Sequence, residues 1–188
     1  MTKNCNNTPM PKPPPFTPTC ILGLGNPGVA YKDTYHSVGF RVVDALAEKL
    51  GCDAKKLIRE KHFEYWRADG RIIARSRTYM NNSGLAARDM LKKFDVSPAR
   101  LLIVHDDSDL RLGTVRYAFG RGAAGHHGVL SVIERLHTKM VWRARIGIRV
   151  TSEKAERFVL RKMREEDKDK LYGVLDAFVR KVTEKENP

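Results

Sequence analysis

The sequence has few cysteines and no long apolar run, and both absences restrict what the protein can be. Its three cysteines, Cys5, Cys20 and Cys52, are odd in number and form no Cys-x-x-Cys pair. This usage favours a reducing compartment over a disulfide framework. No stretch approaches the roughly 20 apolar residues of a membrane helix, and the N-terminus lacks the apolar core of a signal peptide. We therefore expect a cytoplasmic protein with no membrane partner.

Several catalytic signatures are also missing. The chain has no Gly-x-Ser-x-Gly elbow, no P-loop lysine and no His-Glu-x-x-His helix, so a serine or cysteine nucleophile has no support. What remains is a set of imidazoles, carboxylates that could orient them, and amides that could hold a substrate. Such a set suits activation of water by a general base.

Basic residues are in clear excess. The chain holds 35 Lys and Arg against 22 Asp and Glu, a formal charge of +13, which favours a polyanionic partner; general solubility is the alternative explanation. Two expected strands carry arginines opposite an apolar side, since residues alternate across a strand. These arginines are Arg116 in one strand and Arg143, Arg145 and Arg149 in the other.

The pattern of the chain predicts one α/β domain at residues 19–188, preceded by a disordered proline-rich leader at 1–18. Asp69-Gly70 between two apolar runs is the strongest hairpin signal, and Ser37 is a plausible N-cap for the helix that follows it. The expected strands are 20–24, 61–68, 71–77, 101–104, 115–119 and 142–150, and the expected helices are 38–50, 85–94, 129–136 and a charged C-terminal stretch.

The stretch around which the chain is organised follows the first strand. Cys20–Leu24 runs into Gly25–Gly28, where glycines and a proline force a turn. Asn26, Tyr31 and His36 then lie on the loop before the first helix. Because ligands bind at the carboxyl ends of strands in open α/β sheets, we expect a site here.

The same stretch also matches Gly23-x-Gly25-x-x-Gly28, the weak fingerprint of dinucleotide binding. That reading requires a helix beginning at the last glycine and an acidic residue ending the next strand. The residues after Gly28 read as loop, and Asp44 lies in a helical pattern. The context therefore does not support a nucleotide site.

His36 is the best candidate for a general base, and Asp106, the first acid after the second buried strand, is the best partner to orient it. The structural alternatives are a turn-capping role for His36 and an Asx-turn or helix cap for Asp106. Asp107 and Asp109 could suggest a metal site, but alternate acids on a loop are usually solvated. Three further histidines also lack a convincing ligand spacing, namely His105, His126 and His127. We therefore expect no metal.

Five motifs together resemble bacterial-type peptidyl-tRNA hydrolases, over a span from about Thr19 to the C-terminal helix. No single motif is specific, but their order and spacing are. They are Gly23-Leu-Gly-Asn-Pro-Gly28 with Tyr31 and His36, Thr78-Tyr-Met-Asn81 with Ser83-Gly84, His105-Asp106 with Asp109-Leu110, Gly125-His126-x-Gly128, and Arg143-x-Arg-Ile-Gly-Ile148.

The resemblance implies a monomeric, single-domain α/β sandwich in which helices cover a twisted mixed sheet. It implies hydrolysis of the ester that joins a stalled nascent peptide to the 3′ end of tRNA, which recycles the tRNA. His36 would be the general base that activates water, and Asp106 its orienting partner. No cofactor is implied.

The resemblance also implies how peptidyl-tRNA would be bound. Asn26 and Asn81 would position the peptide backbone and the water or oxyanion, with Tyr31 and Met80 lining the site. His127 stands where the family has a substrate-binding asparagine. Finally, two basic positions would hold the 5′ phosphate of tRNA beside its acceptor stem, and here they are Arg116 and Arg145.

The chain departs from the family pattern at a few positions. Ser37 and His127 each replace a usual asparagine, Ala118 stands where a second lysine is common, and no Gly-Pro follows Val150. A catalytically silent relative that binds structured RNA is the alternative. It would explain the charge and the change at 127, but not the retention of the catalytic and amide residues, which are Asn26, His36, Asn81 and Asp106.

Overall fold

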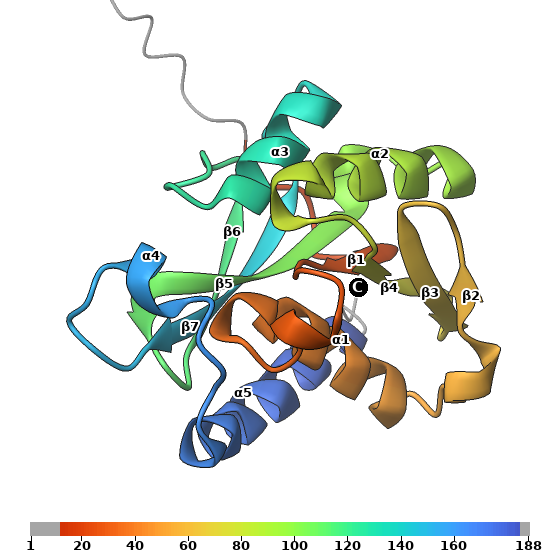
Figure 1. The fold of residues 1–188 in the computed structure, drawn as a ribbon. Coiled ribbons are helices and arrows are strands. Elements are labelled where there is room, and N and C mark those ends of the chain that lie inside the picture. Colours follow the sequence, from red (N-terminus) through yellow and green to blue (C-terminus); the bar gives the residue numbers. More distant parts are fainter. Residues whose placement is uncertain (1–11, 185–188) are drawn as a thin grey trace, which may run out of the picture.

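The computed structural model describes residues 12–184, which form a seven-stranded sheet in the order β2-β3-β4-β1-β5-β7-β6 (Figure 1). The four central strands run parallel, and antiparallel partners flank them on both sides. The strands are β1 (Cys20–Gly23), β2 (Ile58–Arg59), β3 (Phe63–Ala68), β4 (Arg71–Ser76), β5 (Leu101–Arg111), β6 (Val115–Phe119) and β7 (Trp142–Arg149).

Helices cover both faces of this sheet, so the predicted α/β sandwich with a mixed sheet is confirmed (Figure 1). Helices α1 (Val38–Lys49) and α5 (Glu165–Thr183) pack on one apolar core, and α2 (Ser83–Phe94) and α3 (His127–Leu136) pack on the other. The short helices are α4 (Ala155–Phe158), η1 (Val29–Tyr31), η2 (Tyr35–Ser37), η3 (Ala54–Lys56), η4 (Met80–Asn82) and η5 (Pro98–Arg100).

Most predicted elements lie where the local pattern placed them. The hairpin turns at Asp69 (φ 49°) and Gly70 (φ 68°), two positive φ values that suit a primed turn. Helix α1 begins directly after Ser37, but that side chain makes no capping hydrogen bond. Helices α2 and α3 each begin two residues earlier than expected.

The expected strand 101–104 was too short and the loop expected at Asp107 and Asp109 was wrong, because strand β5 continues to Arg111. The apolar run that signalled this strand stops at Val104. The polar residues beyond it stay extended because β7 continues beside them, pairing His105, Asp106 and Asp107 in register. A non-local partner thus extends a strand that its own composition would end.

At Gly39, the backbone at the start of α1 packs directly against the backbone of the sheet. A Cβ atom on Gly39 would lie 2.4 Å from the carbonyl oxygen of Val104 and 2.5 Å from that of Leu24. Only glycine permits an approach this close. The turn before α1, which carries His36, therefore lies directly against the end of β1 and the middle of β5.

The expected leader falls partly outside the described residues, because 1–11 are not among them. Residues 12–18 contain no helix or strand. Within them, the Phe16 ring contacts Tyr117 and Trp142 edge-on, with ring centroids 5.1 Å apart in each case. The boundary at residue 18 stays a prediction.

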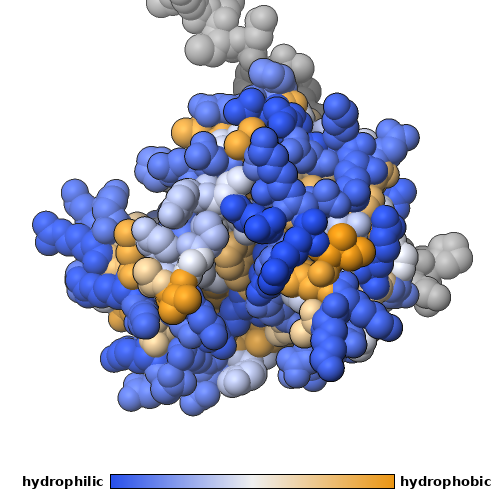
Figure 2. Space-filling view, turned by 45° about the vertical axis from the view of Figure 1, so that its right-hand side comes forward, coloured by the Kyte–Doolittle hydropathy of each residue, from blue (hydrophilic) through white to orange (hydrophobic). Residues whose placement is uncertain are grey.

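Hydrophilic side chains cover most of the face in view in Figure 2, with apolar side chains in separate patches. Among the described residues, no helix is long and apolar enough to cross a membrane.

Candidate active site

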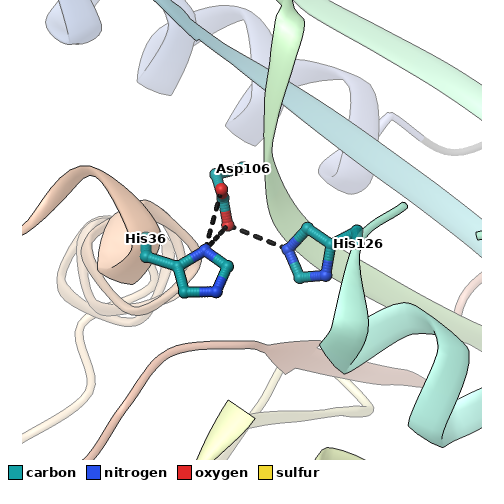
Figure 3. A group of neighbouring side chains, drawn as sticks. All are labelled: His36, Asp106 and His126. Carbon is teal, nitrogen blue, oxygen red and sulfur yellow. Dashed lines mark hydrogen bonds and ion pairs between the residues drawn. The ribbon is translucent and has the colours of Figure 1, made fainter. Parts of the chain in front are cut away.

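Three side chains from distant parts of the chain meet at the middle of β5, just beyond the point where its pairing with β1 ends. Asp106 lies between the imidazoles of His36 and His126, which approach it from two sides (Figure 3). Nδ1 of His36 is 2.9 Å from both carboxylate oxygens, and Nε2 of His126 is 2.9 Å from Oδ1. The carboxylate is only 5% exposed and the His36 side chain 15%. Solvent therefore screens this cluster weakly.

The hydrogen-bond pattern assigns the protons on both imidazoles. Nδ1 of His126 accepts the backbone N–H of Val129 at 3.2 Å, so its proton is on Nε2 and is donated to Asp106. An ionised carboxylate only accepts, so His36 donates its Nδ1 proton as well. Nε2 of His36 is then left without a proton and can act as a base.

Electrostatics keep Asp106 ionised. Burial raises the pKa of this carboxyl group, but the charges of His126 and His36 and the hydrogen bonds from both rings lower it more, to well below its usual range. For His36, burial lowers the pKa, but the negative charge of Asp106 and its hydrogen bond together raise it by more. The pKa of His36 therefore lies above its usual value. Burial and the charge of His126 hold the pKa of His105 well below its usual value.

The same three side chains offer ligand atoms within 4.8 Å of one another, a spacing that a metal ion could also use. The contacts of Asp106 with the two rings have hydrogen-bond lengths, however, and the second ring nitrogen of His126 is occupied by a backbone N–H. The arrangement therefore fits a hydrogen-bonded network better than a metal centre. That the protein needs no metal or cofactor stays a prediction.

A cavity of about 650 Å³ opens beside this cluster. Asn26 lines it with its amide oxygen already bonded to the Met80 backbone N–H at 2.7 Å, which leaves the NH₂ group to donate to a ligand. Asn81 and His127 reach the same cavity as exposed side chains. The predicted substrate-binding residues that line the cavity are Asn26, Met80, Asn81 and His127.

Tyr31 is the predicted substrate-binding residue that the structure places away from the cavity lining. Its ring contacts Tyr79 edge-on, with centroids 6.2 Å apart, and Tyr79 itself lines the cavity while 59% exposed. Tyr31 therefore contacts a residue that lines the cavity but is not itself part of the lining.

The two predicted tRNA-binding arginines are direct cross-strand neighbours. Arg116 on β6 pairs in register with Arg145 on β7, and Arg116 is exposed. Arg145 donates from Nε to Asp107 at 2.6 Å, which fixes the direction of its guanidinium. Arg143, on the same side of β7, is only 3% exposed. This side of the strand is therefore less open to solvent than the alternating sequence pattern predicts.

Comparison with known proteins identifies the chain. The family model "Peptidyl-tRNA hydrolase" matches residues 20–186. The chain belongs to the peptidyl-tRNA hydrolase family. The peptidyl-tRNA hydrolase of Sulfurihydrogenibium sp. is 42% identical over 160 residues, covering 82% of this chain and 84% of that protein. The enzyme of Mycobacterium tuberculosis H37Rv is 42% identical over 134 residues, covering 70% of each chain.

Solved structures of peptidyl-tRNA hydrolases share the fold. The crystal structure of the enzyme from Acinetobacter baumannii matches with a TM-score of 0.75 and 30% identity, covering 88% of this chain and 86% of that one. The resemblance drawn from the five sequence motifs is thus confirmed.

One residue of this peptidyl-tRNA hydrolase site was missed from the sequence. His126 was set aside for lack of metal-ligand spacing, yet it binds Asp106 from the far side. The available signal was its place in Gly125-His126-x-Gly128 at a helix start. A Cβ atom on Gly128 would lie 2.3 Å from Sδ of Met80, so this glycine lets α3 begin close enough for His126 to reach the carboxylate.

Proposed function

We propose that the chain hydrolyses the ester bond between peptide and tRNA in peptidyl-tRNA, with His36 as the general base. The observation that carries the proposal is the bond from Nδ1 of His36 to buried Asp106, which leaves Nε2 unprotonated in a ring that lines the cavity. Nε2 takes a proton from water as the oxygen attacks the ester carbonyl carbon. The bond to the ribose 3′ oxygen then breaks, and that oxygen receives the proton.

Two amides beside the base suit the charge that develops during this reaction. The NH₂ group of Asn26 and the side chain of Asn81 can donate to the ester carbonyl oxygen, which becomes negative as water adds. The bond from the Met80 backbone to the Asn26 amide oxygen fixes the orientation of that donor in advance. Met80 and His127 form the walls that contact the peptide.

We further propose that Arg116 and Arg145 bind the 5′ phosphate of the tRNA, which places the acceptor stem over β6 and β7 and the 3′ end in the cavity. The excess of basic residues supports a polyanionic ligand. The protein would act as a monomer in the cytoplasm, where peptidyl-tRNA is released from translation.

Replacing Arg116 with glutamine is expected to weaken tRNA binding and to reduce its salt dependence. Each lost phosphate contact lowers the slope of log K against log salt by about 0.7–0.9. Arg116 is the cleaner test, because Arg145 also pairs with Asp107. The measurement is tRNA affinity across a salt series, with and without the 5′ phosphate. If the variant still distinguishes the two tRNAs as wild type does, the phosphate is bound elsewhere.

Replacing His127 with alanine is expected to raise KM about two- to tenfold, since one neutral hydrogen bond contributes about 0.5–1.5 kcal/mol. His127→Asn should behave as wild type, because an amide offers the same donor and acceptor as a neutral imidazole. Steady-state kinetics on one N-acetylated aminoacyl-tRNA compare the three proteins. An alanine variant with unchanged KM would mean that His127 does not touch the substrate.

Turnover of an N-acetylated aminoacyl-tRNA by the purified protein tests the proposed function. Release of the N-acetyl amino acid is the expected result. Tight tRNA binding without release would favour the alternative of a silent RNA-binding relative. The intact contact between His36 and Asp106 supports the enzyme over that alternative.

A further inference from the structure

The turn that carries His36 is held by backbone hydrogen bonds to residues 159–163. The backbone N–H of His36 donates to the carbonyl of Val159 at 2.8 Å, and that of Tyr35 donates to Arg161 at 3.2 Å. A β-bridge joins Thr34 to Lys162 beside them. The position of the base is therefore set partly by a segment more than 120 residues away in sequence.

A buried side-chain bond reinforces this backbone pairing. The hydroxyl of Tyr35 donates to Oδ2 of Asp167 at 2.6 Å. Tyr35 is 4% exposed and Asp167 is completely buried in the first turn of α5. The Tyr35 ring also packs edge-on against Phe158, with centroids 5.7 Å apart. The residue next to the base is thus anchored to two C-terminal helices.

The charges around this bond keep the phenol a donor and the carboxylate an acceptor. Burial and the hydrogen bond with Asp167 raise the pKa of Tyr35. Burial raises the pKa of Asp167, but its hydrogen bonds with Tyr35 and Arg164 lower it more. Nε of Arg164 lies 3.0 Å from Oδ2. Bonds to a charged acceptor are stronger than neutral ones, so this contact is suited to hold a turn in place.

We propose that Tyr35 and Asp167 are positioning residues: their buried bond sets the turn so that Nδ1 of His36 stays on Asp106. Tyr35 directly precedes the base, so a displaced Tyr35 backbone carries His36 with it. The inference rests on the proposed function, in which His36 is the base. A purely structural bond that docks α5 is the competing explanation.

The variant Tyr35→Phe removes the hydroxyl and keeps the ring against Phe158. We expect kcat on an N-acetylated aminoacyl-tRNA to fall about tenfold with KM unchanged, since a misplacement of 1 Å can cost about 10²-fold. Tyr65→Phe is the matched control, because Tyr65 is 3% exposed in the opposite core. Asp167→Asn should lower kcat similarly, and the double variant should lose no more than either single one. Losses that multiply would contradict a shared role.

The pH dependence separates positioning from stability. The titratable groups in contact with His36 are Asp106 from β5 and His126 from the start of α3. The other titratable side chains that line the same cavity are Tyr79, His105, Asp107, Asp109, His127 and Glu156. Of these, Asp106 raises the pKa of His36. If the ring moves off Asp106 in Tyr35→Phe, that pKa falls, and the acid limb of the kcat profile moves to lower pH. A variant that melts earlier but keeps the wild-type kcat and acid limb would overturn the proposal.

Titration of the His36 ring by NMR gives a readout that does not require turnover. In Tyr35→Phe the ring should titrate at lower pH than in wild type, and in Tyr65→Phe at the same pH. An unchanged titration overturns the positioning role even if the protein is inactive. An inactive wild type with the expected NMR shift overturns the proposed function alone.

Discussion

The His36→Ala protein is expected to hydrolyse an N-acetylated aminoacyl-tRNA about 10²–10⁴-fold more slowly than wild type, the range for loss of a positioned general base. Affinity for tRNA should change little, because the proposed tRNA contacts lie on β6 and β7. His62→Ala is a matched control: His62 also bonds an aspartate, Asp89, through Nδ1 at 2.5 Å and is similarly buried, but it does not line the cavity. A single-turnover rate within about threefold of wild type would reject His36 as the base.

The direction of the His36 pKa shift fixes the acid side of the activity profile. His36 must be neutral to accept a proton, and its pKa lies above 6.5. Activity should therefore fall as pH drops through a midpoint above that value. The stability of the fold should depend on pH in the opposite direction. Because the pKa of His36 is raised in the folded state, His36 stabilises the fold at pH values below its unfolded pKa, and this contribution is lost as pH rises through the folded pKa.

Replacing Asp106 with asparagine should reduce turnover by up to about 10⁴-fold, the loss known for the same change in a Ser-His-Asp triad. The introduced amide has one oxygen and one NH₂ group. When its oxygen accepts a hydrogen bond from one imidazole, its NH₂ group faces the other. The His36 ring would then place its proton on Nε2 and cease to be a base. Asp89→Asn, which alters the partner of His62, is the matched control. Retention of more than about a tenth of wild-type kcat would contradict an orienting role for Asp106.

The same variant should show a pH-dependent loss of stability. Because the folded pKa of Asp106 is depressed, its stabilising contribution is complete above the unfolded value of about 3.9. It disappears as pH falls from there towards the folded pKa. Urea unfolding should therefore separate wild type from Asp106→Asn at pH 7 and bring them closer at pH 3. An equal gap at both pH values would show that the carboxylate charge is not what stabilises the cluster.

Local patterns predicted the elements whose conformation depends on neighbours in sequence. The hairpin at Asp69-Gly70 and the helix after Ser37 are of this kind. The contact between His36 and Asp106 spans 70 residues, and it followed from placing both at strand ends together with the family motifs. The roles of these residues stay proposals.

The features that sequence reasoning missed depend on partners far along the chain. Strand β5 runs past Val104 only because β7 pairs with its polar half. His126 was judged by metal-ligand spacing, which says nothing about a carboxylate 20 residues away. Tyr35 reads as an ordinary aromatic residue until α5 brings Asp167, 132 residues later, against its hydroxyl.

The extension of β5 divides the catalytic cluster between two classes of local stability. Asp106 lies on an interior strand and pairs with Ile146 of β7, although the pairing of β5 with β1 ends at Val104, so opening its backbone should take more free energy than opening a turn or a helix end. His36 and His126 sit on a 3₁₀ turn and at a helix start, where opening takes less free energy. On warming, the imidazoles should therefore leave the carboxylate before the sheet melts, and thermal inactivation should precede thermal unfolding.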